Sequence, residues 1–444
     1  MKILHYSLGF PPYRSGGLTK FSMDLMREQI REGHEVSLLW PGEMKLVGNA
    51  VSIKKGTDVS GIASFEVINP LPVSYDEGIK DFDAFMNDGD TAVYEKFLDE
   101  LEPDVIHVHT LMGLHKSFLN AAKKKGIRLV FTTHDFFPIC PKVTMFRHGK
   151  VCGSAASCEE CGVCNNTALS LKKIQILQSP AYRATKDSAI VKKMRKQHRD
   201  EYLGDDPDRD ENGSVGTAED YLKLRKHYQE MLSLMDVIHY NSTVAKAAYE
   251  SIIGMPDGKV IPITHEDISD HRKRKEFAGY TLRIRYLGAQ SAAKGYPMLK
   301  NALDELWKER QDFVLDAHFE PVEKAPYIRS HERFGYKDLE EIFEGTDILI
   351  APSIWYETFG FTVLEALSYG VPVMISGTVG AKDILAEGAG IVIDDIDEKK
   401  IIDTVNRLDR NSLTEMNKAV IERQDIMTIS EMSERIINEC YLEG

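Results

Sequence analysis

Short apolar runs alternate along the chain with stretches in which apolar residues recur every three or four positions. Val105–His109 and Asp347–Ala351 are runs of strand length, whereas Phe21, Leu25 and Met26 share one helical face. Continuous apolar runs are typical of strands buried in a parallel sheet, and the longer spacing is that of amphipathic helices. Strand, loop and helix alternate through the chain, which predicts an α/β protein with parallel sheets.

The same pattern extends to other segments. The other predicted strands are Lys2–Leu8, Val36–Trp40, Ile127–Thr133, Asp236–Asn241, Leu282–Leu287, Val314–Ala317 and Val371–Ile375. The predicted helices include 21–30, 114–125, 298–307, 337–344 and 361–369.

The stretch from 347 to 375 is the most informative unit. Its helix is followed by Gly370, a residue typical of a helix C-terminus. Backbone N–H groups after Phe359-Gly360 are expected to face an anion at the helix N-terminus. Glu357 and Glu365 lie eight positions apart, so both can face one crevice. Taken alone, Glu365 could equally compensate the charge of a helix N-terminus.

Length and charge narrow the class of protein. The chain has 444 residues, which suits two domains, and its 43% hydrophobic and 28% charged residues are those of a soluble globular enzyme. The formal charge of −14 argues against a nucleic-acid binder. A strand at the N-terminus and the lack of an apolar stretch of about 18 residues predict a cytoplasmic protein.

Two further loops carry candidate anion contacts. Gly16-Gly17 precedes a predicted helix, where glycine lets the backbone approach a phosphate. Lys294 lies in the loop 288–295, and its ammonium group would stand over the next helix N-terminus. His134 follows the strand Ile127–Thr133, at the edge where α/β sheets place ligands, although a lone histidine there is more often structural.

Five of the six cysteines are clustered in a polar segment with the spacing C-x11-C-x5-C-x2-C-x2-C. They are Cys140, Cys152, Cys158, Cys161 and Cys164. Clustered thiols in a reducing compartment favour a structural tetrahedral Zn²⁺ site, with an iron–sulfur cluster or free thiols as alternatives. His148 could replace one sulfur. Their setting among Gly, Ser, Glu and Asn predicts that they lie outside a hydrophobic core.

A basic stretch, Lys192–Arg199, follows the cysteine segment. It is either a solvated helix face or a surface attracted to an anionic membrane leaflet, which would place the protein at the inner face of the membrane.

The string E-x-F-G-x-x-x-L-E-A-x-x-x-G-x-P-V at 357–373 resembles the E-x7-E signature of retaining family 4 glycosyltransferases. This resemblance implies the GT-B fold, in which two Rossmann-like domains with parallel sheets face each other. Residues 1–256 would form the acceptor domain with a cysteine-bearing insertion at about 140–166. Residues 257–426 would form the nucleotide-sugar donor domain, and 427–444 a helix that crosses back.

The resemblance also implies roles for residues. Glu365 would bind the ribose hydroxyls, Glu357 a sugar hydroxyl, Lys294 the pyrophosphate and His134 the sugar near its anomeric carbon. His134, Lys294 and Glu357 are the catalytic candidates. The donor-binding candidates are Gly16, Gly17, Lys294, Glu357, Thr358, Phe359, Gly360, Phe361 and Glu365. No catalytic metal is expected. Ala289 departs from the family pattern, in which an arginine often follows the glycine, so more of the leaving-group stabilisation falls to Lys294.

The implied activity is retaining transfer of a sugar, hexosyltransferase-like, from a nucleotide-sugar donor. The acceptor would be a sugar or a lipid-linked sugar, in the synthesis of cell-surface polysaccharide or glycoconjugate. One alternative of the same fold is a nucleotide-sugar epimerase, which needs no acceptor. The other is a non-catalytic nucleotide-sugar sensor, in which Ala289 marks lost catalysis.

Overall fold

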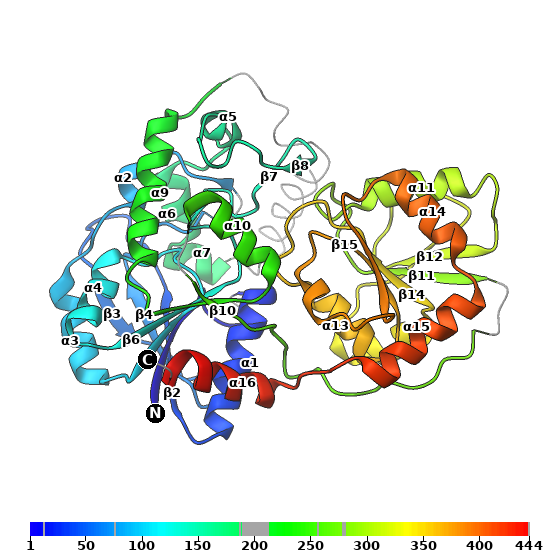
Figure 1. Cartoon of the computed structure of the whole chain (residues 1–444). Helices are drawn as coiled ribbons and strands as arrows, with labels where there is room; N and C mark the ends of the chain where they lie inside the picture. The colour runs from blue at the N-terminus through cyan, green and yellow to red at the C-terminus, as the bar shows by residue number, and fades with distance from the viewer. Residues whose placement is uncertain are drawn as a thin grey trace.

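The computed structural model describes residues 1–11, 14–74, 77–185, 188, 213–254, 257–277 and 281–442. The chain forms two lobes, each with a central sheet flanked by helices (Figure 1). The sequence prediction of an α/β protein with two parallel sheets is therefore confirmed. The basic stretch Lys192–Arg199 lies outside the described residues. Within the described ranges, no helix combines the length and the apolar character that crossing a membrane requires.

The first sheet has the strand order β10-β9-β6-β5-β1-β2-β4-β3, and only β3 runs antiparallel to its neighbour. Its strands are β1 (Lys2–Tyr6), β2 (Glu35–Pro41), β3 (Ser52–Lys55), β4 (Ala63–Ile68), β5 (Val105–Val108), β6 (Arg128–Thr133), β9 (Val237–Tyr240) and β10 (Lys259–Val260). The helices of this lobe are α1 (Gly17–Arg31), α2 (Phe82–Phe85), α3 (Thr91–Leu101), α4 (Lys116–Lys124), α5 (Cys161–Cys164), α6 (Leu171–Leu177), α7 (Pro180–Thr185), α9 (Ala218–Leu232) and α10 (Thr243–Ile253). A small antiparallel pair, β7 (Phe146–Arg147) and β8 (Lys150–Val151), lies in the cysteine segment.

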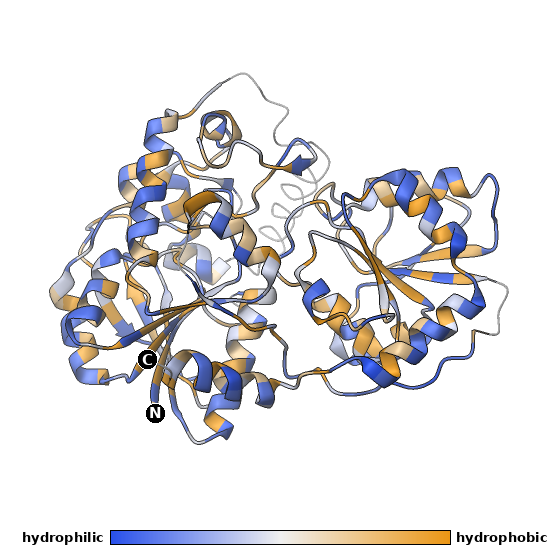
Figure 2. Cartoon of the chain, viewed as in Figure 1, coloured by the Kyte–Doolittle hydropathy of each residue, from blue (hydrophilic) through white to orange (hydrophobic). Residues whose placement is uncertain are grey.

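The second sheet has the order β13-β12-β11-β14-β15-β16 and is parallel throughout. Its strands are β11 (Leu282–Tyr286), β12 (Phe313–Ala317), β13 (Ile328–Ser330), β14 (Ile348–Ala351), β15 (Val373–Ser376) and β16 (Gly390–Ile393). Its helices are α11 (Tyr296–Leu306), α12 (Leu339–Glu344), α13 (Phe361–Ser368), α14 (Glu398–Arg407) and α15 (Arg410–Arg423), with 3₁₀ turns η2 (Tyr336–Asp338) and η3 (Gly380–Ile384). Hydrophobic residues concentrate on the strands and on the inward helix faces (Figure 2).

The unit of strand, loop, helix and strand expected at 347–375 is present in the structure. Only the residues at which its strands and its helix begin or end differ. β15 begins at Val373 instead of Val371, because Pro372 has no N–H for the ladder and contributes only its carbonyl, which accepts from Leu349 N at 3.0 Å. Asp347 precedes β14, and its carboxylate pairs with Arg283 at 2.6 Å. Gly370 adopts a φ of 77° after α13, as a helix C-terminus requires.

The end of the chain packs on the first lobe. Helix α16 (Ile429–Ile436) continues as a π-helical turn, η4 (Ile437–Leu442), and contacts α1. Gln29 Nε2 donates to the Tyr441 hydroxyl at 3.1 Å, and Ser433 Oγ donates to Glu32 at 2.8 Å. These bonds tie the segment that follows the second sheet to the first helix of the chain.

The first sheet extends past the expected domain boundary between 256 and 257. β10 (Lys259–Val260) pairs in parallel with β9, and Ile261 N donates to Tyr240 O at 3.0 Å. The chain therefore leaves the first sheet only after Ile261. A two-residue edge strand carries too short an apolar run to be recognised from the sequence.

Candidate functional site

The loops at the carboxyl ends of the two sheets touch each other. Thr358, in the loop after β14, donates from Oγ1 to the backbone carbonyl of His134 after β6 at 3.2 Å. Ser242, which caps α10, donates from Oγ to the Thr358 carbonyl at 2.6 Å. Carboxyl ends of parallel strands are where α/β folds bind ligands, so this junction is the candidate site.

Two helix N-termini from different lobes meet at this junction. Gly16 precedes α1 with a φ of 119°, and Gly360 precedes α13 with a φ of 102°, conformations that favour glycine. A Cβ added to Gly17 would lie 3.7 Å from the Phe361 ring. The exposed N–H groups and the positive ends of both helix dipoles make this place suitable for an anion.

A pocket at the carboxyl edge of the second sheet gathers part of the predicted set. It is lined by Lys294, Glu357, Gly360 and Phe361, together with Ala289. The sequence predictions for these residues thus fall in one place. Phe359 is buried and does not line the pocket. Glu365 and His134 are also absent from its lining.

Lys294 and Glu357 form an ion pair in this pocket. Trp355 Nε1 also donates to Glu357 Oε2 at 3.1 Å, and the Lys294 ammonium lies 5.0 Å from the centre of the Trp355 ring. The glutamate holds the lysine against the pocket wall beside α13. A ligand phosphate entering here would compete with Glu357 for the ammonium group.

Glu365 lies on the buried side of α13, 4% exposed. Its Oε1 is 3.3 Å from Nε2 of His265, whose ring is flanked by Tyr336 and Phe361 at 5.1 Å each. Among the described residues, neither nitrogen of His265 has a partner in hydrogen-bond geometry. His265 was not predicted from the sequence, because it lies in the connection between the sheets and belongs to no recognisable pattern.

A lysine occupies the centre of the acidic group beside His265. Asp24 and Asp267 could otherwise bind a metal together with His265. Lys20 Nζ, however, lies 2.6 Å from Asp24 and 2.5 Å from Asp267. The ammonium group is thus already paired with both carboxylates.

His134 is held by contacts on both sides. Its Nε2 lies 3.2 Å from His109 Nδ1, and its carbonyl accepts from Thr358. Burial lowers the pKa of His134 to about 3, so the ring is neutral at physiological pH. Burial also raises the pKa of the adjacent Asp135 to about 6.

The cysteine segment folds against the first lobe instead of standing apart from its core. Cys158 is 1% exposed and belongs to the hydrophobic core, which contradicts the expectation from its polar neighbours in sequence. The core is supplied by residues distant in sequence, including Tyr221 of α9. Arg225 of the same helix donates from Nη1 to the Ala156 carbonyl at 2.9 Å and anchors the segment.

Four of the five clustered cysteines line one small pocket. These are Cys140, Cys152, Cys161 and Cys164. Cys161 donates to Cys158, which lowers the pKa of the Cys158 thiol to about 7. No three of the five clustered sulfurs, all within the described ranges, lie within 4.8 Å of one another. The donor set is that of a zinc or iron–sulfur site, and the sulfurs would have to move inward to bind a metal.

The fold defines the class of protein: two facing Rossmann-like lobes with a helix N-terminus from each lobe at the junction between them are the GT-B arrangement. Residues 15–152 match the family described as "Glycosyltransferase Family 4", and residues 321–425 match "Glycosyl transferases group 1". The chain belongs to the family 4 glycosyltransferases with the GT-B fold.

A Klebsiella pneumoniae relative, described as an uncharacterized 42.6 kDa protein in cps region, is 20% identical over 295 residues. The match covers 66% of this chain and 62% of that protein, so it spans less than two thirds of the relative.

Two solved structures share the fold over nearly their whole length. An α,α-trehalose-phosphate synthase (UDP-forming) from Burkholderia xenovorans, in complex with glucose-6-phosphate, has a TM-score of 0.58 and 11% identity, over 99% of this chain and 100% of that chain. The Anabaena protein HepE, in complex with UDP and glucose, has a TM-score of 0.52 and 13% identity, over 99% of each chain.

Proposed function

We propose that this protein is a retaining glycosyltransferase that moves a sugar from a nucleotide-sugar donor to an acceptor hydroxyl. The observation that carries the proposal is the pocket in which Lys294 and Glu357 meet beside the N-terminus of α13. A cation and a helix N-terminus suit a diphosphate, and a carboxylate suits sugar hydroxyls. The nucleotide and sugar bound by HepE, a protein of the same fold, support a donor of this class.

The acceptor is proposed to be a sugar or a lipid-linked sugar in the synthesis of cell-surface polysaccharide. The relative in the cps region supports this setting. The glucose-6-phosphate bound to the trehalose-phosphate synthase supports a sugar acceptor at this fold.

The chemistry requires stabilisation of the leaving diphosphate. The bond between the anomeric carbon and the phosphate oxygen breaks, and Lys294 and the N–H groups at α13 stabilise the negative charge that develops. The acceptor oxygen forms its bond on the same face of the sugar, and its proton passes to the departing phosphate oxygen. Glu357 holds a sugar hydroxyl and Glu365 the ribose, so neither serves as a nucleophile.

A panel of nucleotide sugars tested for thermal stabilisation identifies the donor. NMR of the first-formed glycosidic bond then reads its stereochemistry. We expect transfer with the donor's anomeric configuration retained. An inverted product would overturn the retaining assignment, and a trapped glycosyl-enzyme on Glu357 or Glu365 would overturn the front-face mechanism. Release of free sugar without an acceptor would indicate an epimerase, and donor binding without turnover would indicate a sensor.

A further inference from the structure

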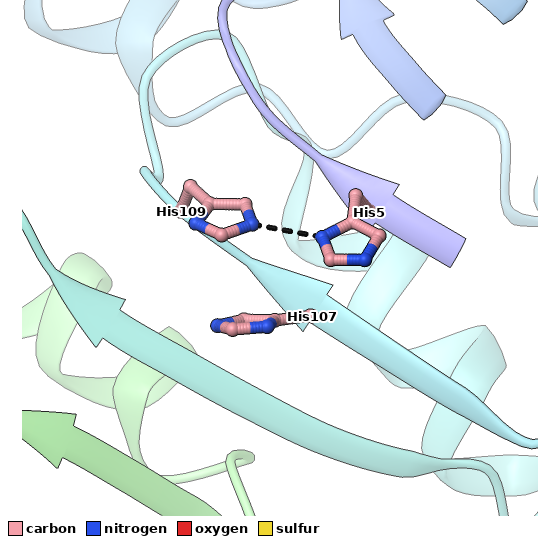
Figure 3. Close-up of side chains that lie close together, drawn as sticks. All are labelled: His5, His107 and His109. Carbon is pink, nitrogen blue, oxygen red and sulfur yellow. Dashed lines mark hydrogen bonds between the residues drawn. The ribbon is translucent and has the colours of Figure 1, made fainter. Parts of the chain in front are cut away.

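Five histidines of the first lobe belong to one buried hydrogen-bonded chain. His5 and His109 lie edge to edge, with His107 beneath them (Figure 3). The links, in order, are His239 Nε2 to Ile261 O (2.7 Å), His239 Nδ1 to Thr132 Oγ1 (2.9 Å), Thr132 Oγ1 to His107 Nε2 (2.6 Å), His107 Nδ1 to Tyr441 Oη (2.7 Å), Tyr441 Oη to Gln29 Nε2 (3.1 Å), Gln29 Oε1 to His5 Nε2 (2.7 Å), His5 Nδ1 to His109 Nε2 (2.9 Å) and His109 Nδ1 to His134 Nε2 (3.2 Å).

A metal ion is the obvious alternative for His5, His107 and His109, because one nitrogen of each lies within 4.8 Å of the others. The geometry favours protons instead. The 2.9 Å between His5 Nδ1 and His109 Nε2 is a hydrogen-bond distance, whereas two nitrogens on one tetrahedral zinc lie about 3.3 Å apart. Both nitrogens of each of the three rings already have partners in the chain.

The rings of the chain are neutral at physiological pH. Burial lowers the pKa of His5 and of His239 to about 4, and it lowers the pKa values of His107 and His109 well below the usual range. A neutral imidazole has one N–H donor and one acceptor nitrogen. Each ring can therefore pass the direction of hydrogen bonding from one neighbour to the next.

The Ile261 carbonyl fixes the direction at one end, because it can only accept. His239 must carry its proton on Nε2, and its Nδ1 must accept from the Thr132 hydroxyl. That hydroxyl has one proton, so it must in turn accept from His107 Nε2. His107 Nδ1 is then an acceptor, and Tyr441 must donate to it.

The direction of hydrogen bonding is fixed in the same way from Tyr441 to the junction between the lobes. Since the Tyr441 proton is committed to His107, Gln29 must donate its amide N–H to Tyr441 and accept from His5 Nε2. His5 Nδ1 then accepts from His109 Nε2. His109 Nδ1 accepts in turn from Nε2 of His134.

We propose that Tyr441 and Gln29 are positioning residues that hold His134 as the tautomer with its proton on Nε2, which leaves Nδ1 as the acceptor. The hydrogen bonds that fix this tautomer begin at Ile261, where the chain leaves the first sheet. They pass through Tyr441, on the segment that returns from the second lobe. The attachment of that segment thus specifies the hydrogen-bonding character of a side chain at the candidate site. The role of Nδ1 as acceptor from a hydroxyl of the donor sugar rests on the proposed function. The tautomer of His134 does not depend on that function.

The test is NMR of the full-length protein labelled with ¹⁵N-histidine, in which long-range correlations distinguish Nδ1 from Nε2. We expect His5, His107, His109, His134 and His239 all to be neutral and protonated on Nε2. The proposal would be overturned if any one of these rings were protonated on Nδ1 alone, or were doubly protonated at neutral pH. Zn²⁺ that binds stoichiometrically and shifts His5, His107 and His109 together would replace it with a metal site.

Tyr441→Phe cuts the chain in its middle and supplies an internal control. His107 and His239, still oriented by Ile261, should stay protonated on Nε2. His5, His109 and His134 lose that orientation and should each show a mixture of the two tautomers. The matched control is Tyr240→Phe, since the buried Tyr240 hydroxyl has no hydrogen-bond partner in the described part of the chain.

A second variant pair guards against general loosening of the fold. Thr132→Val should release the orientation of His107 and of every ring between it and His134, and Thr132→Ser should restore it. An unchanged single Nε2–H form of His134 in both Tyr441→Phe and Thr132→Val would refute the proposal. If the tautomer is as expected but no nucleotide sugar binds, the proposed function fails and the hydrogen-bonded chain stands.

Discussion

The two sheets share a parallel topology but bury different side chains. The first sheet has histidines at the centre of its strands, and His5, His107 and His239 are fully buried and hydrogen-bonded. In the second sheet, β14 and β15, the two strands that flank the α13 unit, bury mainly aliphatic residues.

This difference shows two ways to support a site. In the second lobe the strands β14 and β15 beside the pocket bury mainly aliphatic residues, and the polar groups of the pocket, such as Lys294 and Glu357, lie after the strands end. In the first lobe the polar groups continue inside the sheet and connect His134 with Tyr441 at the end of the chain. The hydrogen bonds inside the first sheet therefore let the site depend on groups far from it.

The largest effect is expected from Lys294→Ala in the second lobe. A cation about 4 Å from the leaving phosphate, at an effective dielectric near 20, contributes roughly 4 kcal/mol. Its loss should lower kcat by up to about a thousandfold, with a smaller rise in donor KM, because the charge grows in the transition state. Steady-state kinetics measure both.

The control for Lys294→Ala is Lys308→Ala, since Lys308 forms an exposed ion pair with Glu305 after α11. If donor binding and turnover were weakened by the same free energy, Lys294 would be a residue that binds the donor without stabilising the transition state.

Acid is expected to destabilise the first lobe selectively. His5 and His239 stay neutral in the folded protein down to a pKa of about 4, while unfolded histidines take up protons near pH 6.5. Below pH 6.5 the unfolded chain therefore binds more protons, and the free energy of unfolding falls as pH decreases. Each such histidine contributes up to about 1.4 kcal/mol per pH unit.

One carboxyl acts in the opposite direction. The pKa of Asp135 is raised to about 6 by burial, so the folded form binds this proton first and offsets one histidine between about pH 6 and 4. For His5 and His239, less the offset from Asp135, we expect a loss of about 3 kcal/mol by pH 5, and the lowered pKa values of His107, His109 and His134 add to it. Urea unfolding followed by hydrogen exchange at pH 7, 6 and 5 separates the lobes. If the free energy of unfolding fell equally in the two lobes, the buried histidines would not be the cause.

The comparison also explains which features were predictable from the sequence. The unit at 347–375 was predicted to within two residues, because its strands are continuous apolar runs and its helix ends at Gly370. Glu357 and Lys294 were both named as site residues. Their ion pair was not predicted, because they are 63 positions apart and meet only when β11 and β14 pair.

The buried histidines could not be predicted in the same way. His5 and His107 interrupt the apolar pattern of their strands, and only the pairing register of β1 with β5 places them opposite each other. Tyr441, the hydrogen-bond partner of His107, is 334 positions away in the sequence. Cys158 is buried for a similar reason, since distant residues of α9 complete the core around it. Local patterns identify elements, whereas these contacts depend on the tertiary structure.

A smaller effect is expected from Glu365→Gln in the second lobe. If the carboxylate accepts hydrogen bonds from ribose hydroxyls, its neutralisation should weaken donor binding by roughly 1–3 kcal/mol. Glu365 Oε1 lies 3.3 Å from Nε2 of His265, which has no partner in hydrogen-bond geometry among the described residues. Calorimetry with the nucleotide measures the loss, and Glu305→Gln on the exposed face of α11 is the control. Unchanged affinity would remove Glu365 from the site.

The smallest effect on activity is expected from removal of a metal at the cysteine segment. Thiolates drawn from Cys140, Cys152, Cys158, Cys161 and Cys164 are predicted to hold about one metal per chain, zinc by preference. Elemental analysis after purification without affinity metals measures it, and visible absorbance with iron would replace zinc by an iron–sulfur cluster. Removal should lower the melting temperature, because the segment packs into the core of the first lobe through Cys158.

Transfer itself should continue in excess chelator at a temperature where the stripped protein stays folded, with turnover changed by less than about twofold. The proposed anion contacts are Lys294 and helix N-termini, which need no metal. A metal-free sample of unchanged melting temperature with five freely titrating thiols would refute the structural site. Loss of turnover in a still-folded, stripped sample would instead place a metal in the reaction, and would show that the second lobe does not stabilise the leaving group through its own residues alone.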